Sequence, residues 1–267
     1  MESCGCRVVI GVDVLATGSG SLVGFALGLL GGGGSILAVP LLIYVVGVKS
    51  PHMAIGTSAL AVSVNAFANL IPHSRAGNVK WPCAVVFAVS GIAGAAAGAH
   101  LGQMLDGQHL LFLFGLVMIA VAIGMLRPRA DSGNPDVTIN LKIALRLIGS
   151  GLAVGLIAGF FGIGGGFLIV PAIMLGSGMA VLNAVGSSLV SVGAFGATTA
   201  TSYALAGLVD WRIAGFFVAG GLAGGFAGVA VAGRLAKQRG LLTRVFAVAV
   251  LAVAGLTLWR SGAQVFG

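Results

Sequence analysis

Two stretches of the sequence decide how the chain folds: residues 24–40 read GFALGLLGGGGSILAVP, and residues 155–171 read GLIAGFFGIGGGFLIVP. Eight positions are identical at an offset of 131 residues, with Gly24, Gly28, Gly31, Gly33, Gly34, Leu37, Val39 and Pro40 falling on Gly155, Gly159, Gly162, Gly164, Gly165, Leu168, Val170 and Pro171. At an offset of 130, Gly56 then matches Gly186 and Trp81 matches Trp211. Because the matches recur in order, the sequence predicts an internal duplication.

The composition of the chain is that of a membrane protein rather than a soluble enzyme. Apolar residues make up 58% of the 267 residues and charged residues only 7%, whereas a soluble domain carries roughly 25% charged residues. Since so few charges cannot cover a surface in water, a lipid bilayer is the expected solvent. The net charge of +8 is explained by basic cytoplasmic loops, and no nucleic-acid partner is expected.

Apolar runs divide the chain into segments, most of them close to the roughly 20 residues that a membrane-spanning helix needs. They lie near residues 8–30, 36–47, 52–72, 82–101, 109–126, 142–161, 167–176, 180–206, 212–232 and 241–259. The short segments 36–47 and 167–176 each follow a glycine cluster and contain a proline. We therefore expect an all-α polytopic protein with about eight full helices and two short, broken ones. Residues 1–130 would form a first membrane repeat, 131–141 a linker and 142–267 a second repeat.

Charges between the segments predict opposite orientations for the two repeats. Basic residues cluster at 73–81, at 127–146 and at 234–244, whereas the 102–109 loop contains Asp106 and neither Lys nor Arg. Placing the three basic regions inside the cell puts equivalent loops of the two repeats on opposite sides and turns both termini outward. Such inverted repeats are typical of transporters with a site at the repeat interface. Whether the short segments cross the bilayer or re-enter it stays open at this stage.

The glycine clusters are the first candidate binding site. Each interrupts an apolar run at membrane depth, where glycine permits positive φ and close approach, and the following short helix presents free N–H groups that suit an anion. The candidate residues are Gly31, Gly33, Gly34, Ser35, Gly162, Gly164, Gly165 and Gly166. The alternative is tight packing without a ligand, which we expect for the glycines spaced four apart, such as Gly20, Gly24 and Gly28.

Polar side chains follow each short segment. The first group is Thr57, Ser58, Ser63, Asn65 and Asn69, and the second is Ser187, Ser188, Ser191, Thr198, Thr199 and Ser202. Hydroxyls and amides need partners inside a bilayer, so they line a solute pathway or bond to neighbouring helices and to their own carbonyls. Thr57, Ser58, Asn65, Ser187 and Ser188 are the first choices for contact with a solute.

Motifs for catalysis are missing from the sequence. The single glutamate is Glu2, so there is no H-E-x-x-H, and all four histidines lie at or before His109. Neither glycine cluster is followed by the Gly-Lys-Ser/Thr of a phosphate loop. We expect no enzyme activity, no cofactor and no metal site.

With GFALGLLGGGGSILAVPLL and GTSALAVSVNA in the first half, and GLIAGFFGIGGGFLIVPAIM and GSSLVSVGA in the second, the chain resembles the TauE/SafE sulfite exporter family over residues 20–260. The resemblance implies transport of sulfite, sulfoacetate, thiosulfate or a related anion across an inner (plasma) membrane. Ile163 replaces Gly32 and Gly166 replaces Ser35 in the second half, so the two half-sites are not chemically equal.

The function expected from the sequence is therefore secondary export of a small sulfur-containing anion. Alternating access would rock one half against the other around the site. A channel-like or facilitative anion pathway and a purely structural membrane protein are the alternatives. The expected partners are the anion and the bilayer, and assembly into a homo-oligomer is left open.

Overall fold

The computed structural model describes residues 2–126, 133–134, 137, 139–162, 166–234 and 239–265. Within these ranges the chain is helical, and pairing of the β type is confined to one bridge between Asn134 and Met179. Seven of the described helices are long and apolar enough to cross a membrane, and shorter apolar helical stretches lie at Gly33–Val46, Gly166–Ser177 and Ala247–Gly262. The predicted all-α polytopic fold is therefore confirmed.

The same order of long and short elements occurs before and after the linker. The first half contains α1 (Glu2–Leu30), a 3₁₀ turn η1 (Gly31–Leu37), α2 (Ala38–Leu41), a π turn η2 (Leu42–Val46), α3 (Pro51–Arg75), α4 (Trp81–Met104) and α5 (Gly107–Leu126). The second contains α6 (Leu141–Phe161), α7 (Gly166–Ser177), α8 (Val181–Leu205), α9 (Trp211–Arg234) and α10 (Arg239–Val265). Each expected apolar segment corresponds to one of these helical stretches, η1, α2 and η2 together forming the first short one.

Polar caps fix the start of several helices. The hydroxyl of Ser50 accepts the N–H of Met53 at the start of α3, and Pro51 occupies the first turn, where no N–H is needed. The side chain of Asn140 accepts the N–H of Ile143 at 2.9 Å and caps α6. Before α5, Oδ2 of Asp106 accepts the N–H of Gln108 at 3.0 Å. This bond, followed by the contact with His109, lowers the pKa of the Asp106 carboxyl.

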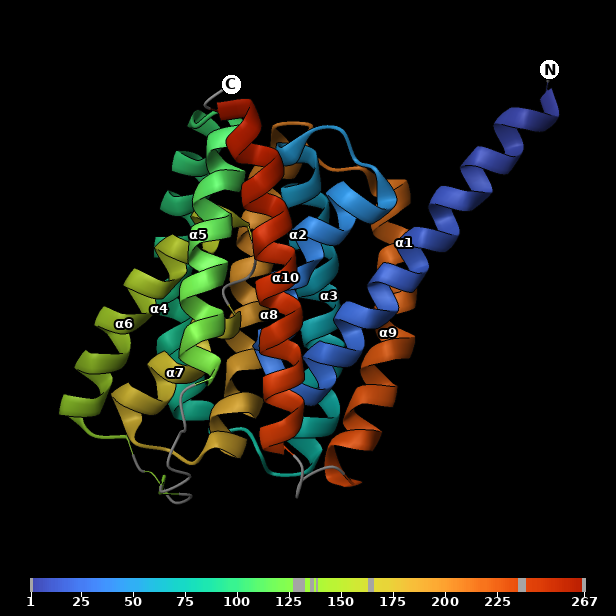
Figure 1. The fold of residues 1–267 in the computed structure, drawn as a ribbon. Helices are drawn as coiled ribbons and strands as arrows, with labels where there is room; N and C mark the ends of the chain where they lie inside the picture. Colours follow the sequence, from blue (N-terminus) through green and yellow to red (C-terminus); the bar gives the residue numbers. More distant parts are fainter. Residues whose placement is uncertain are drawn as a thin grey trace.

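The helices pair across the two halves (Figure 1). The first helix of each half packs on the fourth helix of the other, so that α1 lies on α9 and α6 on α4. The third helices, α3 and α8, cross each other at the centre, and α5 packs on α10. The short segments η1 and α7 also contact one another. Each half therefore completes its packing only with the other.

Glycines form the contact surfaces of the two first-to-fourth pairs. On α1, a β-carbon at Gly20, Gly24 or Gly28 would overlap the backbone of α9 at Phe217, Gly221 and Gly225 in turn. On α6, a β-carbon at Gly155 or Gly159 would overlap the backbone of α4 at Gly91 and Ala95. The packing role predicted for glycines spaced four apart is thus confirmed, and both pairs run parallel because the contacts advance in the same direction.

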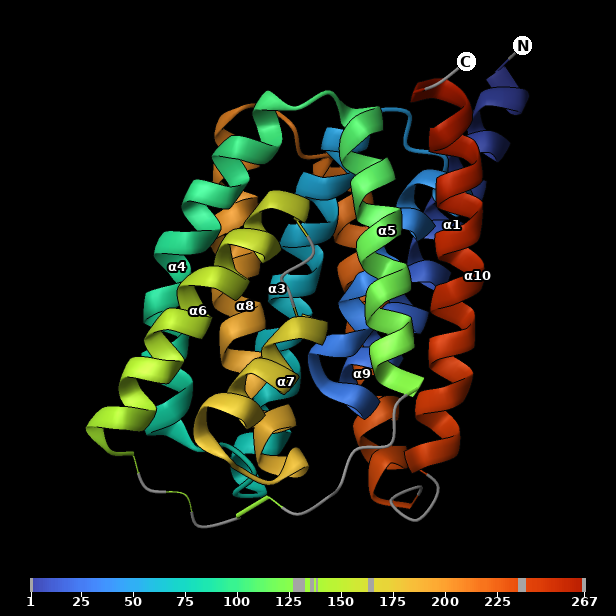
Figure 2. The ribbon, with the colours of Figure 1, turned by 60° about the vertical axis from the view of Figure 1, so that its left-hand side comes forward.

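The two ends of the bundle carry different loops (Figure 2). Both chain termini lie at one end of the bundle. At the other end lie the α3–α4 turn, the end of α5, the start of α6, the end of α9 and the start of α10. The described parts of the three regions predicted to share one membrane side therefore lie at one end of the molecule. After α1 the short segment returns toward the end where α1 began, and α7 returns toward the start of α6, so these segments fold back rather than cross.

Candidate functional site

The first glycine cluster is a tightly wound helical turn. Gly31–Gly34 lie inside η1, and the positive-φ glycines among the described residues are Gly47, Gly77, Gly162, Gly178 and Gly207. The expectation of positive φ at the first cluster is therefore wrong, because a 3₁₀ turn continues the helical path. Gly33, Gly34 and Ser35 are buried, and a β-carbon at Gly34 would lie 2.5 Å from the backbone nitrogen of Leu27. Close packing on α1 explains the glycine at this position.

The second cluster does break the chain at the expected place. Gly162 ends α6 with a φ of 66°, and a β-carbon there would overlap the side chain of Ile55. Gly166 is buried and begins α7, while Gly164 and Gly165 lie outside the described residues. Since η1 contacts α7, the structure brings the two short segments together at the interface of the halves.

Thr57 and Ser187 form equivalent bonds at opposite ends of the molecule. The Thr57 hydroxyl accepts the backbone N–H of Asp210 at 3.0 Å, and the Ser187 hydroxyl accepts the backbone N–H of Lys80 at 2.9 Å. In each case the central helix of one half holds the loop before the fourth helix of the other half. We call this pair of bonds the cross-half latches.

Ser58 and Ser188 bond within their own helices. The Ser58 hydroxyl donates to the carbonyl of Ile55 at 2.9 Å, and the Ser188 hydroxyl donates to that of Val185 at 2.8 Å. Both side chains are fully buried. Bonding within the protein, one of the two interpretations of these hydroxyls, therefore describes the four first-choice hydroxyls at Thr57, Ser58, Ser187 and Ser188 in this conformation. Ser191 and Thr199 of the second group are instead fully buried without a hydrogen-bond partner in the described part of the chain.

Asn65 differs from the other four first-choice residues. Its side chain is fully buried, and neither Oδ1 nor Nδ2 has a hydrogen-bond partner among the described residues. Two residues earlier, the Ser63 hydroxyl donates to the carbonyl of Gly193 at 2.7 Å, where α3 crosses α8. Asn65 is thus an unsatisfied amide beside the centre of the molecule.

Some buried polar groups were not singled out by sequence reasoning. Tyr203 is fully buried, its hydroxyl is unbonded within the described part of the chain, and its ring centroid lies 6.3 Å from that of His52. The internal matching of the sequence could have pointed to Tyr203, because this residue falls on His73 at the offset of 130. A polar ring at both positions was visible in the sequence, but its depth was not.

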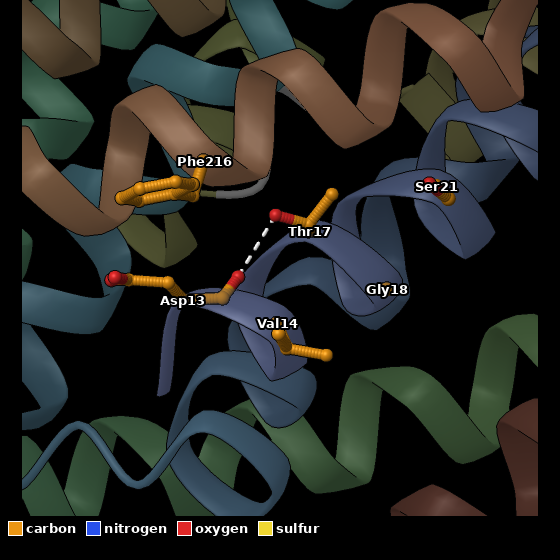
Figure 3. A pocket seen from close by; sticks show the side chains of 6 residues that line it. All are labelled: Asp13, Val14, Thr17, Gly18, Ser21 and Phe216. Atoms are coloured by element: carbon orange, nitrogen blue, oxygen red, sulfur yellow. Dashed lines mark hydrogen bonds between the residues drawn. The ribbon is translucent and has the colours of Figure 1, made fainter. Parts of the chain in front are cut away.

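A groove lies between α1 and α9 near the end that carries the termini. It has a volume of about 530 Å³ and is lined by Asp13, Val14, Thr17, Gly18, Ser21 and Phe216. Figure 3 shows the Phe216 ring on the α9 side and the Thr17 hydroxyl donating to the carbonyl of Asp13 at 2.8 Å. The carboxylate of Asp13 pairs with Arg212 of α9 at 2.8 Å. The predicted binding residues do not line this groove.

A family model identifies the chain. The model for the sulfite exporter TauE/SafE matches residues 16–257, which span both halves. The chain belongs to the TauE/SafE sulfite exporter family. The resemblance seen in the sequence is therefore confirmed, and the TauE/SafE assignment makes the chain a multi-pass membrane transporter in a lipid bilayer.

Individual relatives agree with the TauE/SafE assignment. A probable membrane transporter protein of Xylella fastidiosa (strain Temecula1) is 53% identical over 253 residues, covering 94% of this chain and 97% of the relative. The probable membrane transporter protein YunE of Bacillus subtilis (strain 168) is 26% identical over 84% of this chain and 87% of its own length. The probable membrane transporter protein MJ0441 of Methanocaldococcus jannaschii is 30% identical over 58% of this chain and 60% of the relative. No solved structure matches.

Proposed function

We propose that the protein exports a small sulfur-containing anion, such as sulfite, sulfoacetate or thiosulfate, across a bacterial inner membrane by alternating access. The observation that carries this proposal is the contact between the two short segments, η1 and α7, inside a chain of the TauE/SafE family. Interrupted helices that meet between repeats are a common way to build a transporter site. An inside-negative membrane potential would drive an anion outward without further coupling.

The proposed architecture is a pair of inverted repeats. Residues 1–130 and 142–267 would be the repeats and 131–141 the linker. The pairing of α1 with α9, of α6 with α4 and of α3 with α8 supports this division, since each pairing has an equivalent under exchange of the halves. Figure 1 agrees, because α1 begins at the end where the chain termini lie and α6 begins at the opposite end.

The moving bodies that we propose differ from the sequence halves. Glycine contacts lock α1 to α9 and α4 to α6 at backbone distance, so a rigid half could not move without breaking both seams. We propose instead that the α1–α9 pair moves against the α4–α6 pair around the crossing of α3 and α8. The cross-half latches at Thr57 and Ser187 would each hold one end of the protein closed. In the transport cycle only one latch would be broken at a time.

The backbone of the two glycine segments would bind the anion. Gly31, Gly33, Gly34 and Ser35 on one side, and Gly162, Gly164, Gly165 and Gly166 on the other, would supply N–H groups without a formal charge. Hydroxyls released from the latches, together with Ser58, Ser188 and Asn65, would complete the solvation of the anion when α3 and α8 move.

Purified protein in liposomes tests the function. Vesicles loaded with sulfite, thiosulfate or sulfoacetate should release the solute at a rate that saturates with concentration, and an outward gradient should drive counterflow of labelled solute. Conductance that rises linearly with concentration, without counterflow, would identify a channel-like pathway instead. If all three solutes leave the vesicles no faster than they leave loaded vesicles without protein, anion transport of this class is refuted.

A further inference from the structure

The buried amide of Asn65 is the strongest unexplained feature of the interior. Its side chain is fully buried, and both amide atoms are without a hydrogen-bond partner in the described part of the chain. An unpaired amide is costly to bury because it gives up its bonds to water and receives nothing in return. Asn65 lies about midway along α3, so the bilayer core offers no water to compensate. A residue kept at this cost has a task other than stability.

The neighbouring helix makes room for the amide. A β-carbon at Gly221 of α9 would overlap Nδ2 of Asn65, and one at Gly225 would lie 2.5 Å from Nδ2 of Asn69. The Asn69 amide donates to the backbone carbonyl of Asn65 at 2.8 Å and reaches α1, where its Oδ1 would lie 3.2 Å from a β-carbon at Gly28. The two amides therefore lie along the α1–α9 seam. Asn69 is level with Gly28 of α1, which lies about one helical turn before the first glycine cluster.

The equivalent position in the other half shows that packing does not require an amide. At the offset of 130, Asn65 falls on Phe195 and Gly221 falls on Gly91. Phe195 is fully buried, and its ring fills the space beside Gly91 as the Asn65 amide fills the space beside Gly221. An apolar side chain thus satisfies the same helix contact in the second half. The amide gives the first half a hydrogen-bonding capacity that its counterpart lacks.

We propose that Asn65 is a solute-binding residue and that it recognises an oxyanion carrying one acidic proton. The inference rests on the proposed transport function and names the chemical class of its solute. From an oxyanion, Nδ2 can bind only an oxygen with a free lone pair, and Oδ1 can accept a hydrogen bond only from a protonated oxygen. A singly protonated oxyanion such as hydrogensulfite offers both groups on one edge, whereas sulfate offers no hydroxyl. A monoanion is also cheaper than a dianion to bring to a site without a formal charge.

Access to Asn65 follows from the movement of the helix pairs. Because the amide is packed against Gly221, a solute reaches it when α3 separates from α9, and the amide then forms bonds that the closed packing withholds. The groove in Figure 3 is not this site, since the residues that line it include Phe216 of α9 but neither Gly221 nor Asn65.

Two matched pairs of probe anions test the chemistry with purified wild-type protein at one pH just below neutrality, where hydrogensulfite and bicarbonate are both present as monoanions. Hydrogensulfite and chlorate, which are both pyramidal monoanions, form one pair, and bicarbonate and nitrate, which are both planar monoanions, form the other. Calorimetry should show that the hydroxyl-bearing member of each pair binds about tenfold more tightly, as expected for one additional hydrogen bond to a charged partner. Equal affinities within both pairs, or no binding of either hydroxyl-bearing anion, would overturn the proposal.

Variants then assign the binding to Asn65. Asn65→Leu should melt no lower than wild type without solute, because it removes an unpaired amide, yet its affinity for hydrogensulfite should fall about tenfold. Asn65→Asp, which removes the donor and adds an acceptor, should show at least as large a loss. Phe195→Leu, at the equivalent position, is the control and should keep the wild-type affinity even if it melts lower.

The outcomes separate this inference from the proposed function. Unchanged hydrogensulfite affinity in Asn65→Leu, or a large fall in its melting temperature without solute, would show that the amide is structural and overturn the inference. Binding that depends on Asn65 in a protein that moves no anion in liposomes would leave the inference standing and refute the transport mechanism.

Discussion

The α1–α9 seam offers a sharp test of how the helices are held together. The change is Gly24→Ala, a single methyl group placed where the two backbones touch. A β-carbon on Gly24 would lie 2.6 Å from the carbonyl carbon of Gly221, whereas ordinary contact begins at 3.4 Å. The helices must therefore separate locally by at least about 0.8 Å, the difference between these two distances, and by more to clear the carbonyl oxygen of Gly221, which the β-carbon would overlap. Overpacking of this kind destabilises a protein by about 1–3 kcal/mol.

Gly18 on the same helix is the matched control, because no atom lies within 4 Å of the place where its β-carbon would be. Gly18→Ala should leave the protein as stable as wild type or stabilise it by up to about 1 kcal/mol, since alanine favours a helix over glycine. Thermal unfolding in detergent, followed by size-exclusion chromatography of the heated samples, measures both variants. If Gly24→Ala melts at or above the temperature of Gly18→Ala, the two backbones are not in contact and the cross-half seam is wrong.

Three further predictions concern polar contacts. Thr57→Val keeps the shape of the side chain but leaves the Asp210 N–H without its acceptor, so it should destabilise the protein by about 1–2 kcal/mol. Ser187→Ala should have the same effect at the other end of the molecule. Wild-type melting temperatures in both variants would contradict the latches. The pKa of Asp106 is lowered in the folded state, so the ionised carboxylate should stabilise the protein fully above the ordinary carboxyl pKa and lose this effect as the pH falls through the lowered value. The melting temperature of Asp106→Asn should therefore depend less on pH in acid than that of wild type. The Arg212 side chain is 57% exposed and the Asp13 side chain 16%, so water screens the pair from the arginine side. Asp13→Asn should therefore cost about 1 kcal/mol, and a loss of several kcal/mol in chemical denaturation would indicate a fully desolvated ion pair.

Most of the helical architecture could be predicted because it depends on local properties of the sequence. Hydropathy located the apolar segments, and the matching of Trp81 with Trp211 is part of the pattern that predicts a duplication. The charges of the loops predicted that three distant regions share one end of the molecule, and the described helix ends that flank these regions do lie there. These features follow from which residues tolerate lipid and which remain in water.

The pairing of helices could not be predicted because the repeat alone does not say which helix of one half meets which helix of the other. Gly24 and Gly221 each marked a face suited to close approach, but their contact is a tertiary fact. The 3₁₀ winding of Gly31–Gly34 was missed because four glycines permit many conformations, and neighbouring α1 selects one.

The candidate binding residues show the same division. Thr57 and Ser187 were identifiable as an equivalent pair of hydroxyls, yet their partners, the N–H groups of Asp210 and Lys80, are more than 100 residues away in sequence. The unbonded state of Asn65 depends on what surrounds it, and a sequence pattern cannot show this.

The contact between α1 and α9 also constrains how the protein is made. Helix α1 leaves the ribosome early, but the surface that it needs begins only at Trp211. During synthesis its glycine face must stay uncovered, or be shielded by lipid or an insertion factor, until most of the chain has entered the bilayer. A premature stop before α9 would leave α1 without its permanent neighbour and would mark the fragment for quality control.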